Sequence, residues 1–280
     1  MSDVAIRAQS LVLGYGSTVA LASSSFEIPR GKVTVVIGPN GSGKSTLLSA
    51  IAGLIAPARG GIEVLQNLDA VPRISYVLQT TKVNDALPIS VREVVMMGRY
   101  ANAGAYRWFN QDDRDAVSEA MDRTGIANLA SRHLNDLSGG QRQRVFVAQG
   151  LAQDHDLLLL DEPLTGIDLP TALAIDLVIH DELKRGCTVI MTTHDLSEAQ
   201  VADNVVLLSG RVVACGSPDE VLTPDNLREA YGAALLHVEN DRIFIDDAAH
   251  APVPGRHLHR DRTIHTESSR SDLHKDDKQS

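Results

Sequence analysis

A glycine-rich segment near the start of the chain has residue types that could bind phosphate. It consists of Gly38, Pro39, Asn40, Gly41, Ser42, Gly43, Lys44, Ser45 and Thr46, and it fits the pattern G-x-x-x-x-G-K-[ST]. Residues 32–37 are mostly apolar and β-branched and predict a buried strand, while residues 46–55 predict a helix. Backbone N–H groups of such a loop converge on an anion at the helix N-terminus. We therefore expect Lys44 to reach the outer phosphates of a nucleotide and Ser45 to help hold Mg²⁺.

Two adjacent carboxylates could complete a hydrolytic site. Asp161 and Glu162 follow residues 157–160, a run of leucines that predicts a buried strand. Asp161 could coordinate Mg²⁺, directly or through water. Glu162 could polarise a water for in-line attack on the γ-phosphate. A strand that ends in two acidic residues and then turns into solvent would have the same sequence pattern. The phosphate-binding pattern upstream is therefore what favours a hydrolytic role for this pair.

Two further features of the sequence are candidates for the same site. The first is Leu137, Ser138, Gly139, Gly140 and Gln141. It precedes a predicted helix, where a serine and glycine amides at the N-terminus make another anion site. The second is His194, which directly follows a predicted strand at residues 188–193. A lone histidine after a strand is usually structural, so its position in this series of motifs is what makes His194 a candidate.

These residues must be positioned by a sheet and its helices. Residues 91–151 show helix-like spacing of apolar residues and predict a helical block. Strands are predicted in residues 3–30 (as short strands), 61–65, 73–79, 156–161, 188–193 and 204–208. The later strands alternate with helices, which predicts a mainly parallel sheet and an α/β fold.

Over about residues 3–235, the order and spacing of these motifs resemble the ATPases of the ABC family. The resemblance implies a P-loop NTPase core with a RecA-like, mainly parallel sheet, an antiparallel β flank and a helical subdomain. It also implies one ATPase domain at residues 3–240, with the helical subdomain at about 88–152.

The resemblance implies that ATP and Mg²⁺ bind between two copies of the chain. One copy holds them through the phosphate-binding loop, with Lys44, Ser45 and Asp161, and the partner copy completes the site with Ser138 and Gly140. Glu162 and His194 then support hydrolysis. The expected assembly is therefore a homodimer in which a single subunit is a poor ATPase.

Three more positions match family residues with defined roles. Gln79 matches the glutamine that senses Mg²⁺ and water and links the nucleotide to the membrane partner. Asp168, at the end of residues 165–168, matches the loop that crosses the dimer. Tyr15 matches the aromatic residue that stacks on adenine, although an isolated tyrosine could equally be surface packing.

Local similarity indicates the class of transporter. Residues 86–100 resemble the ATPases of importers for manganese, zinc or iron, and to a lesser degree those for iron-siderophores and cobalamin. Residues 161–168 favour the metal-ion branch. The implied partners are integral membrane permease subunits and an external metal-binding protein. The implied location is the cytoplasmic face of the cell membrane.

Composition excludes several other classes. The chain has 280 residues, a net charge of −10 and 4% aromatic residues, which disfavours a nucleic-acid partner. The two cysteines, Cys187 and Cys215, form no C-x-x-C pair, and the absence of a secretory leader adds to the expectation of a reducing, cytosolic environment. No apolar run approaches the ~20 residues that cross a bilayer.

The last residues, 246–280, differ from the rest of the chain. They contain His250, His257, His259, His265 and His274 and few large apolar residues. Such a segment buries too little apolar surface to offset its ordering entropy, which predicts disorder. We favour a solvated tail, with weak Zn²⁺ chelation by His257 and His259 as the alternative.

Two other functions fit much of the same sequence. An importer of iron-siderophores or cobalamin shares the nucleotide chemistry and differs in cargo. A soluble ABC ATPase of cluster assembly would lack a membrane partner. A nucleotide-binding module without turnover is disfavoured because Glu162 and His194 are both present.

Overall fold

The computed structural model of the chain describes residues 3–65, 72–79, 88–100, 109–232, 236–239 and 242–245. The histidine-containing tail predicted at residues 246–280 lies outside these residues. Strands β10 (Leu236–Glu239) and β11 (Arg242–Ile245) pair as an antiparallel hairpin. None of the helices in the described ranges is long and apolar enough to cross a membrane.

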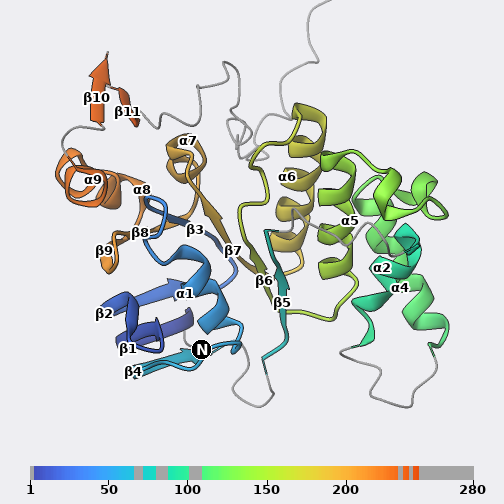
Figure 1. The fold of residues 1–280 in the computed structure, drawn as a ribbon, viewed down its shortest axis with the longest axis horizontal. Helices are drawn as coiled ribbons and strands as arrows, with labels where there is room; N and C mark the ends of the chain where they lie inside the picture. Colours follow the sequence, from blue (N-terminus) through green and yellow to red (C-terminus); the bar gives the residue numbers. More distant parts are fainter. Residues whose placement is uncertain are drawn as a thin grey trace, which may run out of the picture.

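A six-stranded sheet forms the centre of the molecule, in the order β5-β6-β7-β3-β8-β9 (Figure 1). The strands are β5 (Ile74–Val77), β6 (Leu157–Leu160), β7 (Thr188–Thr193), β3 (Val33–Ile37), β8 (Asn204–Leu208) and β9 (Val212–Gly216). All pair in parallel except β8 with β9. The mainly parallel α/β sheet expected from the alternation of strands and helices is therefore confirmed.

The central strands are covered on both faces. Every residue of β3, β6, β7 and β8 is buried, as in sheets that carry helices on both sides. Leu157 and Leu159 pack with helix α1 (Lys44–Ile51), while Leu158 and Leu160 belong to the core with α5 (Gly139–Leu151) and α6 (Leu169–Lys184). Alternate side chains of one strand thus join two separate cores.

A three-stranded antiparallel sheet covers α1. Its order is β2 (Thr18–Pro29), β1 (Val4–Tyr15) and β4 (Arg59–Val64). The prediction of short strands in residues 3–30 was wrong, because β1 and β2 are each twelve residues long. A register shift beside Ser10 lets β1 continue past this position instead of ending there. The predicted helix at 46–55 also differs: α1 starts at Lys44, and it ends at Ile51 because the chain turns at Gly53, where φ is 73°.

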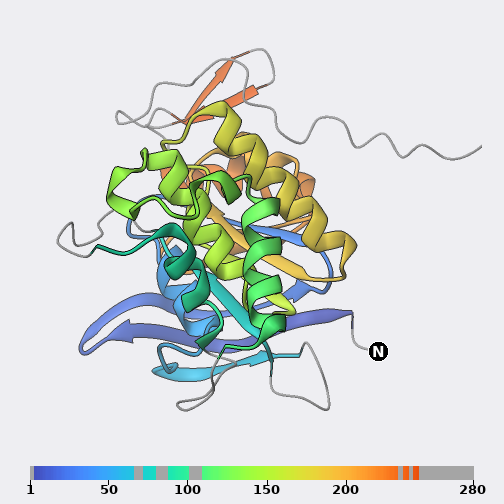
Figure 2. The ribbon, with the colours of Figure 1, turned by 90° about the vertical axis from the view of Figure 1, so that its right-hand side faces the viewer.

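The other face of the sheet carries a layer of helices (Figure 2). Besides α5 and α6, it contains α2 (Val91–Met97), α4 (Gln111–Arg123) and the 3₁₀ turns η1 (Ala127–Leu129) and η2 (Leu134–Asp136). Capping boxes at Ser90 and Asn110 define the starts of α2 and α4. The short helices α7 (Leu196–Gln200), α8 (Pro218–Val221) and α9 (Pro224–Tyr231) complete the fold near β3, β8 and β9.

One buried ion pair joins the helices of this layer. Arg99, just after α2, donates to Asp113 of α4 at 2.9 Å, and the two side chains are 8% and 0% exposed. The same guanidinium donates to the Ala152 carbonyl at the end of α5. Arg99 therefore connects three helices through a largely buried guanidinium.

We predict that Arg99→Ala lowers the free energy of unfolding by about 3 kcal/mol, because it leaves Asp113 buried without its guanidinium. Urea denaturation followed by circular dichroism measures this change. The matched control is Arg73→Ala, which breaks the more exposed pair with Asp156 and should cost less than about 1 kcal/mol. Equal losses in the two variants would contradict the prediction.

Candidate active site

The predicted site residues follow the carboxyl ends of four neighbouring strands. Gln79 follows β5, Asp161 follows β6, His194 follows β7 and the glycine-rich loop follows β3. Carboxyl ends of adjacent parallel strands meet at one edge of a sheet, where ligands of open α/β folds bind. The topology therefore gathers segments from distant parts of the sequence at this edge.

The glycine-rich loop passes close to other backbone. Gly43 has φ 101°, a left-handed conformation, and a Cβ built on it would lie 2.9 Å from the Ala20 carbonyl of β2. A Cβ on Gly38 would lie 2.2 Å from the Leu208 carbonyl of β8. Both positions therefore require glycine, and the loop is held between the two sheets with α1 starting directly after it.

Lys44 lies over this loop. Its ammonium donates to the carbonyls of Gly38 at 2.8 Å and Pro39 at 3.2 Å, and the residue is buried. Burial lowers the pKa of Lys44, while the negative charges of Glu162 and Asp161 act in the opposite direction. The cationic side chain is thus fixed between the loop and the acidic pair.

The loop also contains a polar atom that fits a phosphate oxygen. The Ser42 hydroxyl oxygen is buried and has no hydrogen-bond partner within the described ranges. Buried polar groups are normally paired, because an unpaired one costs about 1–3 kcal/mol. A phosphate group in the loop would satisfy this hydroxyl. Ser45, in the first turn of α1, and Asp161 carry oxygen atoms of the kind that Mg²⁺ prefers, which fits their predicted role.

Thr192 holds the acidic pair in place, a role that the sequence did not predict. Its hydroxyl donates to Asp161 Oδ1 at 2.6 Å and accepts a hydrogen bond from the Glu162 backbone N–H at 2.8 Å. Glu162 has φ 49°, a conformation that costs energy for a non-glycine residue. The Thr192 contact therefore helps to hold the backbone of Glu162 in this conformation. The available signal was the pair of threonines, Thr192 and Thr193, that ends β7.

Residues from β5 also contact the acidic pair. Gln79 Nε2 donates to Glu162 Oε2 at 2.7 Å, which brings together two residues predicted to act in hydrolysis. The Tyr76 hydroxyl lies 3.4 Å from Asp161 Oδ2, and burial raises the pKa of Tyr76 to about 12. Tyr76 was not predicted as a site residue. At neutral pH it stays protonated and can donate to the carboxylate.

Tyr15 and His194 lie at the borders of this group. Tyr15 ends β1 and is 57% exposed, so its ring is accessible on the sheet that contacts the glycine-rich loop. His194 directly follows β7, two residues after Thr192. The next residue, Asp195, caps α7 by accepting from the Ser197 backbone N–H.

The second glycine motif belongs to another part of the chain. Ser138 is the N-cap of α5: its hydroxyl accepts from the Gln141 N–H, and the Gln141 side chain accepts from the Ser138 N–H. Leu137 is buried, and a Cβ on Gly140 would lie 2.7 Å from Thr171 Oγ1. Because α1 and α5 pack on opposite faces of the sheet, their N-termini lie in different layers.

Asp168 connects this motif to α6. It caps α6 by accepting from the Thr171 N–H at 3.0 Å. Hydrogen bonds from Thr171 and the charge of Arg144 lower the pKa of Asp168. A Cβ on Gly140 would lie 3.4 Å from its carboxylate, so the starts of α5 and α6 lie against each other. Asp168 and the Ser138 motif therefore form one surface of the subunit.

The chain is similar in sequence to known proteins. The family model for the ABC transporter domain matches residues 21–165. The chelated iron transport system membrane protein YfeB of Yersinia pestis is 38% identical over 233 residues, which cover 81% of this chain and 79% of YfeB. The manganese transport system ATP-binding protein MntB of Bacillus subtilis (strain 168) is 35% identical over 244 residues, which cover 86% and 97% of the two chains.

Two further similarities extend the comparison. The zinc transport system ATP-binding protein TroB of Treponema pallidum (strain Nichols) is 36% identical over 256 residues, covering 89% of this chain and 96% of TroB. A solved structure described as an inward-facing conformation of a metal-chelate type ABC transporter aligns with a TM-score of 0.73 at 27% identity. That alignment covers 86% of this chain and 95% of the solved one.

We predict that Thr192→Val lowers the rate of ATP hydrolysis about tenfold or more, because it removes the hydroxyl that orients Asp161 and Glu162. ATP affinity should change less, since the loop and Lys44 remain. Thr188→Val is the matched control: it changes the same strand at its opposite end, where the hydroxyl contacts the Gly31 N–H. Turnover and nucleotide binding of the purified variants measure both effects, and equal turnover in the two variants would refute the role of Thr192.

Proposed function

The chain belongs to the ABC transporter family and is one of its ATPases, and we propose that it powers the import of a divalent metal ion through separate membrane subunits. The ABC ATPase fold expected from the sequence is confirmed. The observation that carries the proposal is the similarity, over more than four-fifths of the chain, to proteins named for transport of chelated iron, manganese and zinc. Manganese or zinc is the proposed cargo, and iron is the next candidate.

The arrangement at the sheet edge supports a defined role for each group. We infer that the glycine-rich loop and Lys44 bind the ATP phosphates and that Tyr15 stacks on the adenine. Ser45, Gln79 and Asp161 would hold Mg²⁺, which when bound neutralises charge on the phosphates. Glu162 accepts a proton from the attacking water, Gln79 and Thr192 orient that carboxylate, and His194 positions the water.

Hydrolysis is proposed to require two copies of the chain. Ser138 and Gly140 lie at the start of α5, on the other face of the sheet from α1, so one subunit does not bring them to its own loop. In a homodimer, the Ser138 motif of one subunit would face the phosphates bound by its partner. Asp168, which lies against Gly140, would then also lie at the dimer interface.

The proposed membrane partner docks beside Gln79. Leu78, Met97 and Tyr100 are large apolar residues that are 43–60% exposed, and they flank Gln79 and helix α2. Such residues suit a permease surface that covers them. In this proposal the subunit lies at the cytoplasmic face of the membrane, and an external metal-binding protein delivers the cargo. An importer of iron-siderophores or cobalamin is the second candidate, favoured by the similarity to the solved metal-chelate type transporter.

We predict that Glu162→Gln lowers ATP turnover by at least about 100-fold, because it removes the general base. In a strain whose only copy carries this change, the cellular content of manganese or zinc should fall under metal limitation. Elemental mass spectrometry of the cells measures this content, and Glu63→Gln, an exposed change on β4, is the control.

Each outcome of this experiment has a distinct meaning. A selective fall in iron would favour iron as the cargo, imported as the ion or as a siderophore. Unchanged content of every metal despite lost turnover would reject metal import, and capture of the membrane partner would then test other cargo. Retained turnover in Glu162→Gln would reject the assigned base.

We also predict that Glu162→Gln forms a dimer when ATP is added, because bound ATP is held but not hydrolysed. Size-exclusion chromatography with light scattering should show a doubled mass. Lys44→Ala is the control, because it weakens phosphate binding and should stay monomeric. A monomer for Glu162→Gln with saturating ATP would contradict the shared site.

A further inference from the structure

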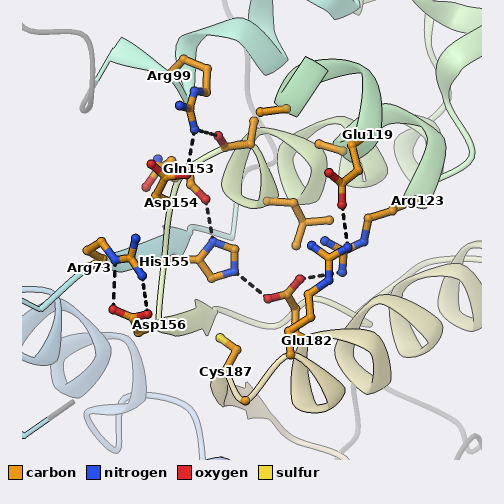
Figure 3. A pocket seen from close by; sticks show the side chains of 16 residues that line it. Arg73, Arg99, Glu119, Arg123, Gln153, Asp154, His155, Asp156, Glu182 and Cys187 are labelled. Carbon is orange, nitrogen blue, oxygen red and sulfur yellow. Dashed lines mark hydrogen bonds and ion pairs between the residues drawn. The ribbon is translucent and has the colours of Figure 1, made fainter. Parts of the chain in front are cut away.

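A second cluster of ionisable residues lies at the opposite edge of the sheet from the proposed ATP site. His155 precedes β6, Cys187 precedes β7 and Glu182 lies near the end of α6. Because β6 and β7 are parallel neighbours, the residues before them lie side by side. The three side chains line a cavity of about 290 Å³ (Figure 3). None of them has a role in the proposed hydrolysis.

The cluster offers three different ligand atoms at short range. One atom each from His155, Glu182 and Cys187 lies within 4.8 Å of the other two. All three side chains are at most 5% exposed. Imidazole nitrogen, thiolate sulfur and carboxylate oxygen are together the ligands of Zn²⁺ and similar ions.

The imidazole of His155 has an acceptor at each ring nitrogen. Nδ1 lies 2.8 Å from the Gln153 carbonyl, and Nε2 lies 2.9 Å from Glu182 Oε2. A carbonyl only accepts, so Nδ1 carries a hydrogen and Nε2 faces the carboxylate. A neutral ring would then point a lone pair at an oxygen, so Nε2 needs either a second proton or a bound cation. Histidine ligands of metals commonly donate their other N–H to a backbone carbonyl in this way.

Glu182 is oriented by a second partner. Burial tends to raise its pKa, but contacts with His155 and Arg123 outweigh this and hold the pKa at about 2. Arg123 donates to Oε1 at 2.5 Å, while Oε2 faces His155. Glu182 is thus an ionised carboxylate with one oxygen fixed and the other directed into the cluster.

The same geometry argues against cysteine catalysis. Burial raises the pKa of the Cys187 thiol, and the charge of Glu182 raises it further. Reactive cysteines instead have a lowered pKa. Both nitrogens of His155 face oxygens, so neither is directed at the sulfur as a base. Cys187 could instead act as a metal ligand, because a bound metal ion displaces the thiol proton.

The arginines around the cavity are compensated by acids. Arg73 pairs with Asp156, Arg99 with Asp113 and Asp154, Arg123 with Asp181 and Glu182, and Arg185 with Glu119 and Asp181. Their positive charge is therefore largely neutralised, and the cavity can admit a cation.

We propose that His155, Glu182 and Cys187 bind one Zn²⁺ or a similarly thiophilic divalent ion, with water from the cavity as the fourth ligand. On binding, the Cys187 thiol and His155 Nε2 release their protons to solvent as the bonds to the ion form. Tetrahedral zinc with bonds of about 2.0 Å to nitrogen and oxygen separates these two atoms by about 3.3 Å, close to the observed 2.9 Å. The site is independent of which cargo the transporter carries.

Cobalt provides a direct test with the purified full chain. Co²⁺ added to the metal-free protein should give a near-ultraviolet thiolate-to-cobalt charge-transfer band that saturates at one equivalent and disappears when Zn²⁺ is added. Cys215→Ser, which removes the other cysteine, in β9, should keep the band, whereas Cys187→Ser should lose it. A missing band in the parent, or its loss in Cys215→Ser alone, would overturn the proposal.

Zinc binding gives the second readout. Zn²⁺ should raise the Tm of the parent and of Cys215→Ser. The affinity should fall as the pH is lowered, because protons compete with the ion for the Cys187 sulfur. His155→Gln and Cys187→Ser should each bind at least about tenfold more weakly. The same Tm shift in Cys187→Ser as in the parent would refute the site. Neither measurement involves transport, so failure here leaves the proposed import function standing.

Discussion

The parallel pairing of β3, β6 and β7 is the constraint on which the rest of the molecule depends. These strands are buried at every position, and their register sets Ile37 beside Thr193 and Leu160 beside Met191. Thr192 therefore lies one residue beyond the partner of Leu160, where its hydroxyl reaches both Asp161 and the backbone of Glu162. A shift of one residue would turn each strand's side chains to the opposite face and remove this contact.

The pairing also separates two kinds of chemistry. The carboxyl ends of the strands gather the phosphate-binding loop, Lys44 and the acidic pair. The amino ends place His155 next to Cys187 across β6 and β7. The strands lie between these two edges, so the acidic pair Asp161 and Glu162 is held away from the Cys187 thiol.

The helical layer is joined to the site edge through buried polar contacts as well as apolar packing. The Ser75 hydroxyl of β5 donates to the Gly150 carbonyl of α5 at 2.9 Å. Gln79 lies at the end of β5 and Ser138 at the start of α5, so this contact connects the two elements that carry them. Arg99 in turn links α5 to α2 and α4. A displacement of the helices that flank the proposed permease surface would therefore move Gln79 and alter its hydrogen bond with Glu162.

The sequence by itself determined the fold class and the residues proposed for ATP chemistry. Glycine, lysine and carboxylate positions follow local rules: a glycine loop needs particular backbone angles, and apolar strands must precede it. The sequence could not determine where α1 ends, which depends on the turn at Gly53, or how far β1 and β2 pair, which depends on their register.

Only the tertiary structure revealed Thr192 and Tyr76 at the acidic pair, because their contacts come from other strands. It alone joined Cys187 to His155 and Glu182, residues with no local metal motif. Their proximity arises from strand order in the sheet, a property that spacing along the chain does not encode.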